Sequence, residues 1–139
     1  MKNYIVGVLL LVSVIGVSQK HYGITKKKDW VTYKKADNLI KKHSYYNAID
    51  LLKSLSDSLQ DVEHVQYKMG SAYLLARDYK NAAVYLQKVA NQQERVALLP
   101  MSIYDYGQAL NMLGEYTKAK TQYLRFMRLK NKSKSIKVK

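Results

Sequence analysis

The feature that most constrains the fold of this chain is a repeat of 34 residues. Three segments align without internal gaps, at 29–62, 63–96 and 100–133, and only residues 97–99 separate the last two. Repeat position eight is small, positions eleven and twenty-four are large, position seventeen is tyrosine and position twenty is alanine in all three segments. A small residue lets two helix backbones approach, and large residues fill the space around that contact. Each segment is therefore expected to fold as two packed helices.

The apolar spacing within each repeat places the helices. We expect first helices (A helices) at about 29–42, 63–76 and 100–113, and second helices (B helices) at about 45–58, 79–92 and 116–130. The breaks fall at 43–44, 77–78 and 114–115, just before the position-seventeen tyrosines. No strand-like alternation is sustained anywhere, so the sequence predicts an all-α fold of six helices.

This pattern resembles the tetratricopeptide repeat (TPR), a 34-residue helix–turn–helix unit that stacks into a solenoid. The resemblance implies that the A helices line a concave groove, with positions two, five, nine and twelve facing a ligand. Position five is tyrosine in every repeat, and such rings suit peptide recognition. The alternative is that these rings only pack against the next helix. The expected groove residues are Trp30, Tyr33, Asp37, Ile40, His64, Tyr67, Ser71, Leu74, Met101, Tyr104, Gln108 and Asn111.

One ligand known for this family is not expected here. Chaperone-binding members use Lys and Asn at set groove positions to hold a C-terminal carboxylate. The corresponding residues in this chain are Tyr33, Asp37, Lys68, Met101 and Asp105. A carboxylate clamp is therefore not predicted.

The first eighteen residues have the pattern of a secretory signal peptide. A lysine at position 2 precedes an apolar run over 4–17, which is shorter than the roughly 20 residues that span a bilayer. Small residues at 16 and 18 predict cleavage before Gln19; an uncleaved signal anchor is the alternative. Residues 19–28 would form a lead-in to the repeats. Because export without cysteine fits a bacterial envelope, we expect a periplasmic or outer-membrane-associated protein.

Charge is unevenly distributed in this chain of 139 residues with a formal net charge of +14. From Thr117 to the end there are nine basic and no acidic residues, and residues 19–42 are also basic. Basic ends favour phosphates, anionic lipid or an acidic protein surface; a solvated helix face with a disordered tail at 134–139 is the alternative. Export disfavours nucleic acid as a partner. The candidate basic end consists of Lys118, Lys120, Arg125, Arg128 and Lys130.

Catalytic and metal-binding patterns are weak. The chain has no cysteine, so disulfides, thiolate metal sites and cysteine nucleophiles are excluded. The three histidines lie 21 or 22 residues apart, and no phosphate-binding or nucleophile-elbow motif occurs. We therefore expect neither an enzyme, nor a metal site, nor a cofactor.

A finer resemblance concerns the stretch 100–120, the start QKHYG at 19–23 and the AD-x-L-I segment at 36–40. These are similar to the N-terminal TPR domain of OmpA-family envelope proteins in Bacteroidota, some of which serve gliding motility or type IX secretion. The resemblance implies a scaffold that binds a protein or peptide in an envelope complex. The alternative function is binding of anionic surfaces, with peripheral membrane contact, through the basic ends.

The third repeat is expected to lack a capping element. Solenoid arrays need a polar outer face at each end, because each repeat buries its face only against neighbours. We therefore expect apolar residues at the end of the array to be partly open, and to be covered by a partner, by self-association or by a missing domain. These residues are Tyr106, Leu113, Tyr123 and Met127.

Overall fold

The protein, seen in a computed structural model, consists of helices joined by short turns in the residues that the structure describes, which are 23–55, 57–96 and 99–137. Those residues form seven helices and no strand, which confirms the all-α prediction. The expected signal peptide at 1–18 and residues 19–22 of the lead-in lie outside the described residues, as do Ala97 and Leu98. The helices are α2 (Lys27–Lys41), α3 (Tyr45–Lys53), α4 (Asp57–Gln60), α5 (Glu63–Leu75), α6 (Tyr79–Val96), α7 (Met101–Met112) and α8 (Tyr116–Lys137).

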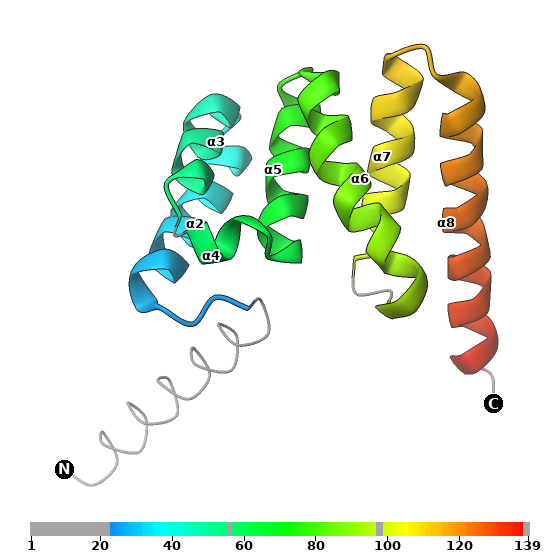
Figure 1. Cartoon of the computed structure of the whole chain (residues 1–139), viewed down its shortest axis with the longest axis horizontal. Helices are drawn as coiled ribbons and strands as arrows, with labels where there is room; N and C mark the ends of the chain where they lie inside the picture. Colours follow the sequence, from blue (N-terminus) through cyan, green and yellow to red (C-terminus); the bar gives the residue numbers. More distant parts are fainter. Residues whose placement is uncertain (1–22, 56, 97–98, 138–139) are drawn as a thin grey trace, which may run out of the picture.

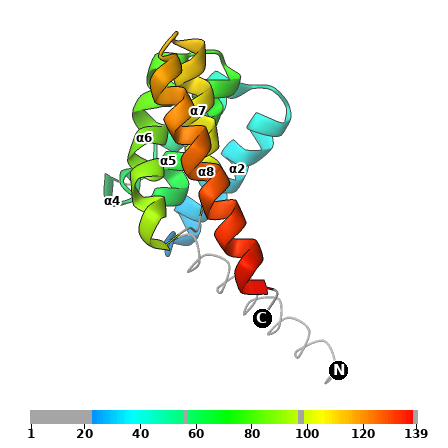
Figure 2. The ribbon, with the colours of Figure 1, turned by 90° about the vertical axis from the view of Figure 1, so that its right-hand side faces the viewer.

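The helices lie in a row, in the order of the sequence. Each of the longer helices packs mainly on the one before it and the one after it, as Figure 1 shows from α2 at one end to α8 at the other. The A helices also contact one another, because α2 touches α5 and α5 touches α7. Figure 2 looks at the α8 end of the row and shows α8 in front of α7 and α6. The buried side chains are consequently spread along the row and do not gather at one centre.

Three turns of the same kind join the A helices to the B helices. His43, Arg77 and Gly114 each have a positive φ, of 61°, 62° and 81°, and each occupies repeat position fifteen. The amide of the next residue donates to the carbonyl of position eleven over 2.9 Å in every case, from Ser44 to Leu39, Asp78 to Tyr73 and Glu115 to Leu110. These bonds satisfy the last carbonyls of each A helix, as a left-handed C-cap does. The expected breaks therefore fall where the sequence predicts them.

Small residues lie at the contacts between paired helices. Ala36, Gly70 and Gly107 at position eight are all buried. The alanines at position twenty, Ala48, Ala82 and Ala119, are also buried. Both sets lie where the repeat pattern requires backbones to approach, so the expected packing role of these positions is confirmed.

The first B helix is shorter than predicted. Helix α3 ends at Lys53, and a separate turn, α4, follows, where one helix over 45–58 was expected. The side-chain amide of Gln60 donates to the carbonyls of Leu52, over 3.2 Å, and Leu55, over 3.1 Å. It thus replaces main-chain donors that a continuing helix would supply. The Ser54 hydroxyl bonds the Leu51 carbonyl, a local interaction that competes with helix continuation.

The last two B helices are longer than predicted. Helix α6 continues to Val96, and α8 continues to Lys137. The expected basic tail at 134–139 is thus helical as far as 137. The sequence of α8 explains this extension, because it contains no glycine or proline and is rich in Lys and Arg, which favour helix.

Candidate functional site on helices α2, α5 and α7

The residues expected to face a ligand all lie on α2, α5 and α7, but they differ in exposure. Tyr33 is only 5% exposed, so its ring has almost no free surface. That burial corrects the expectation of an open tyrosine in every repeat. Met101 and Asn111 are exposed, and the remaining members are half-buried: Trp30, Asp37, Ile40, His64, Tyr67, Ser71, Leu74, Tyr104 and Gln108.

Tyr33 is enclosed by neighbours from two repeats. Its ring stacks on Trp30 of the same helix, with centroids 5.9 Å apart. The Lys68 ammonium, from α5, lies 5.5 Å from the Tyr33 ring centroid, within the range of a cation–π contact. In the first repeat the position-five tyrosine therefore packs against the next A helix, which is the alternative role stated for this row.

Asp37 lies between two lysines. Lys41 is 2.9 Å from its carboxylate on the same helix, and Lys68 reaches it from α5. Burial opposes ionisation of Asp37, but hydrogen bonds and charge attraction from Lys68 and Lys41 outweigh it and hold the pKa at about 2. This cluster ties the first A helix to the second.

Tyr67 makes the corresponding link between the second and third A helices. Its hydroxyl donates to the Asp105 carboxylate over 2.8 Å. Burial raises the pKa of Tyr67, and the nearby Asp105 charge raises it further. Burial also raises the pKa of Asp105, although the hydrogen bond from Tyr67 works in the opposite direction. The pair is polar and half-buried, so one side of it stays open to solvent.

The position-five tyrosines thus contact position six of the following A helix: Tyr33 meets Lys68, and Tyr67 meets Asp105. The third, Tyr104, packs instead against Tyr123 and Phe126 of α8, with centroids 5.4 and 5.5 Å away. Lys68 and Asp105 were not among the residues expected to face a ligand. Their place directly after position five in successive repeats is the signal that identifies them as links between repeats.

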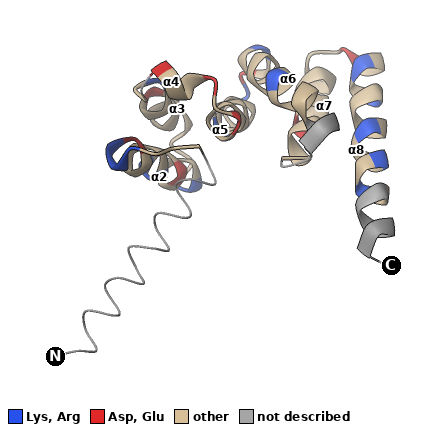
Figure 3. Cartoon of the chain, turned by 60° about the horizontal axis from the view of Figure 1, so that its bottom comes forward, with Lys and Arg blue, Asp and Glu red and all other residues tan. Residues whose placement is uncertain are grey.

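The basic end on α8 is divided into exposed and packed groups. Lys118, Lys120, Arg128 and Lys130 are exposed, and Lys118 pairs with Glu115 over 3.0 Å. Arg125 is half-buried and donates to the Ala90 carbonyl of α6 over 3.3 Å, so it helps to fix α8 on the row. Figure 3 shows the basic residues along α8.

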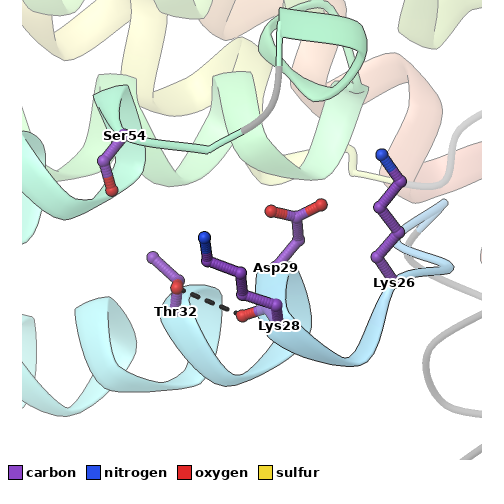
Figure 4. A pocket seen from close by; sticks show the side chains of 5 residues that line it. All are labelled: Lys26, Lys28, Asp29, Thr32 and Ser54. Atoms are coloured by element: carbon purple, nitrogen blue, oxygen red, sulfur yellow. Dashed lines mark hydrogen bonds between the residues drawn. The ribbon is translucent and has the colours of Figure 1, made fainter.

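A small polar cavity of about 430 Å³ lies at the other basic end, beside the start of α2. Figure 4 shows the Lys26, Lys28 and Asp29 side chains around it, with Ser54 on the opposite wall. Asp29 is 6% exposed, and the Thr32 hydroxyl already donates to the Lys28 carbonyl over 3.1 Å. Because a carboxylate shares the cavity with two ammonium groups, neither an anion nor a cation is clearly favoured there.

The described residues lack two other kinds of site. No group of three or more His, Asp or Glu side chains there lies close enough together to hold a metal ion. No helix within the same described ranges is long and apolar enough to cross a membrane.

No protein-family model matches the sequence, and no curated protein matches it significantly.

Proposed function

We propose that this chain is a TPR scaffold of three helix–turn–helix repeats that binds a partner protein or peptide. The architecture is supported by the three left-handed turns at repeat position fifteen, which share the same hydrogen bond to position eleven. It is also supported by the buried small residues at positions eight and twenty. An array built from one repeated unit offers a continuous surface along its A helices, which is how solenoids bind extended partners.

The observation that carries the binding role is the mixed character of the surface of α2, α5 and α7. Aromatic and apolar side chains there keep part of their area exposed, among them Trp30, Tyr67, Leu74, Met101 and Tyr104. Polar groups lie between them, namely Ser71, Gln108 and Asn111. Amphipathic rings beside amide and hydroxyl groups suit the contacts of a peptide, which has both apolar side chains and backbone donors and acceptors.

The proposed setting is the bacterial envelope. The signal-peptide pattern at 1–18 and the resemblance to OmpA-family TPR domains support an exported protein, periplasmic or associated with the outer membrane. A partner in a gliding, type IX secretion or OmpA-type complex follows from the same resemblance.

Site-specific photocrosslinking in the cells that make the protein tests the binding role. A benzophenone amino acid is placed at Met101 or Asn111, which are exposed on α7, and at Lys88, which is exposed on α6, as the matched control. We expect the same discrete crosslinked species from Met101 and Asn111, and none from Lys88. Absence of that species at both α7 positions, or equal yield from Lys88, would contradict a binding surface on the A helices.

A test of the architecture is independent of any partner. Inserting a second copy of residues 63–96 directly after the first adds one whole repeat. We expect unchanged helicity per residue and a higher unfolding midpoint, because each repeat is stabilised by its neighbours. A loss of cooperative unfolding would argue against a repeating array.

A second candidate function is binding of anionic surfaces through the basic ends. The observation that favours it is the set of exposed cations on α8, where the sequence from Thr117 onward has no acidic residue. Sedimentation with phosphatidylglycerol vesicles at rising salt tests it, because electrostatic binding weakens as salt screens the charges. Unchanged binding in high salt would exclude it.

A further inference from the structure

The outward face of α8 is open at two positions, twenty-eight and twenty-one, each of which is buried in one of the earlier repeats. Position twenty-eight is Ala90 in the second repeat, which is 0% exposed, and Met127 in the third, which is 56% exposed. Position twenty-one is Ile49 in the first repeat, which is 1% exposed, and Lys120 in the third, which is exposed. The same part of the repeat therefore changes from covered to uncovered at the end of the row.

The row itself shows what covers this face elsewhere. Helix α5 packs on α3, and α7 packs on α6, so the next A helix lies against each earlier B helix. Among the described residues no helix follows α8, which ends the row in Figures 1 and 2. The place that the next A helix takes on α3 and α6 is therefore not filled on α8 by any helix of the described residues.

The open face combines apolar and basic side chains in one stripe. Tyr116, Lys120, Leu124 and Met127 follow one another at steps of four, four and three residues, which places them on one side of α8. The three apolar members are 69%, 46% and 56% exposed, in that order. Arg128 is also exposed and follows Met127 directly. We call Tyr116, Lys120, Leu124 and Met127 the α8 face; Arg128 lies beside it.

Charge selects the occupant of the α8 face. Because the sequence from Thr117 to the end holds nine basic and no acidic residues, a second copy of α8 would meet a helix of like charge. An acidic helix would instead be attracted to Lys120 and Arg128 while its apolar side covers Leu124 and Met127.

The second and third A helices show how such a helix would be recognised. The carboxylate of Asp105 on α7 accepts a hydrogen bond from Tyr67 on α5. Tyr104 occupies the same repeat position in α7, and it is half-buried at the end of the row. An acidic side chain on a following helix would accept a hydrogen bond from Tyr104, as Asp105 accepts one from Tyr67.

We propose that the α8 face binds an acidic amphipathic helix of another protein, which packs on α8 as α7 packs on α6. This interaction goes beyond the proposed function, because it uses the end of the row and not the surface of the A helices. Its success or failure therefore leaves the crosslinking test of that surface unaffected.

The probe is a stapled peptide of residues 100–113, which contain the helix that covers the equivalent face of α6. Its outward positions carry Met101→Glu, Asn111→Glu and Met112→Glu in the acidic form, and Lys at the same positions in the basic form. Fluorescence anisotropy measures binding of each labelled peptide to the full chain. We expect the acidic form to bind at least about tenfold more tightly than the basic form.

Variants of the full chain locate the site. Leu124→Glu and Met127→Glu should each weaken the acidic peptide about tenfold or more, because they place like charge on the apolar stripe. Lys120→Glu should reverse the preference between the two peptides. Val84→Glu is the matched control, since Val84 is 54% exposed on α6 and its substitution should leave the affinity unchanged. Circular dichroism melts confirm that each variant is folded.

Four outcomes would overturn the proposal. The first two are equal binding of the acidic and basic peptides, and equal loss of affinity with Val84→Glu. The third is a dimer, seen by light scattering, that Leu124→Glu dissociates, which would assign the face to a second copy. The fourth is binding of phosphatidylglycerol vesicles that depends on Leu124 when neither peptide binds, which would assign it to a lipid surface.

Discussion

Gly70 in α5 approaches Leu86 in α6 so closely that a Cβ atom at position 70 would lie 2.6 Å from the Leu86 Cγ. The third repeat has the same contact, since a Cβ on Gly107 would lie 2.7 Å from the Tyr123 ring. Real Cβ atoms do not approach that closely, so each helix pair depends on the missing side chain. This contact between positions eight and twenty-four sets the spacing of the paired helices in both repeats.

Gly70→Ala should lower the free energy of unfolding by about 1–3 kcal/mol through overpacking. Helix propensity alone would give the opposite sign, a gain of about 1 kcal/mol for Gly→Ala in a helix interior. Urea denaturation measures the change. In a Leu86→Ala background the side-chain contacts at 2.6 and 2.8 Å are absent and only the backbone nitrogen of residue 86, at 3.2 Å, stays close, so the same Gly70→Ala step should cost much less. Destabilisation of equal size in both backgrounds would show that Leu86 is not the limiting contact.

The sequence predicted the helix pairs because the signals for them are local or strictly periodic. The position-eight and position-twenty residues recur at the same place in each 34-residue segment, and each turn is fixed by a few neighbouring residues. The predicted end of α3 was wrong because the real end depends on Gln60. The side-chain amide of Gln60 donates to the carbonyls of Leu52 and Leu55. A side-chain interaction of that kind leaves no periodic trace.

The site was predicted less completely than the fold. Periodicity placed the position-five tyrosines on A helices. The exposure of each ring, however, depends on which side chains of the next repeat pack against it. Tyr33 is buried by Trp30 and Lys68, whereas Tyr67 stays partly open beside Asp105. Of the residues expected to be open at the end of the array, Tyr106 is 8% exposed and so is buried, while Leu113 and Met127 are exposed.

The turns at position fifteen predict two opposite mutational effects. Arg77 has a φ of 62°, which costs a side-chain-bearing residue about 1 kcal/mol, so Arg77→Gly should stabilise the protein by a similar amount. Gly114 has a φ of 81° and open space around it, so Gly114→Ala should destabilise by about 1 kcal/mol through the backbone alone. Thermal melts compare the two. Changes of the same sign would contradict equivalent left-handed turns.

Asp37 predicts a specific loss of stability in acid. Its pKa is lowered from 3.8 to about 2 in the folded protein, so the folded state binds its proton more weakly than the unfolded chain does. The resulting stabilisation is present above pH 3.8 and is lost as the pH falls to about 2. Urea midpoints across this window should fall more steeply for the parent than for Asp37→Asn. Parallel curves would show that Lys68 and Lys41 do not stabilise the carboxylate.

Tyr67→Phe should destabilise the protein by about 1.5–3 kcal/mol at neutral pH, because it removes a donor from the half-buried Asp105 carboxylate. The pKa of Asp105 is already raised by burial, and loss of the Tyr67 hydrogen bond should raise it further. A raised carboxyl pKa favours the folded state only where the carboxyl is protonated. The destabilisation by Tyr67→Phe should therefore be present above the pKa of Asp105 in the folded protein. It should shrink as the pH falls toward 3.8, the ordinary carboxyl value.

Urea denaturation at several pH values and NMR titration of the Asp105 carboxyl measure both effects. Tyr46→Phe is the matched control, because Tyr46 is 62% exposed on α3 and loss of its hydroxyl should change stability little. If Tyr67→Phe costs no stability at neutral pH, Tyr67 stabilises the array through its ring alone, since the variant keeps the ring and loses only the hydroxyl. The second and third A helices would then be held together by packing, and the Asp105 carboxylate would be available to a ligand of the A-helix surface.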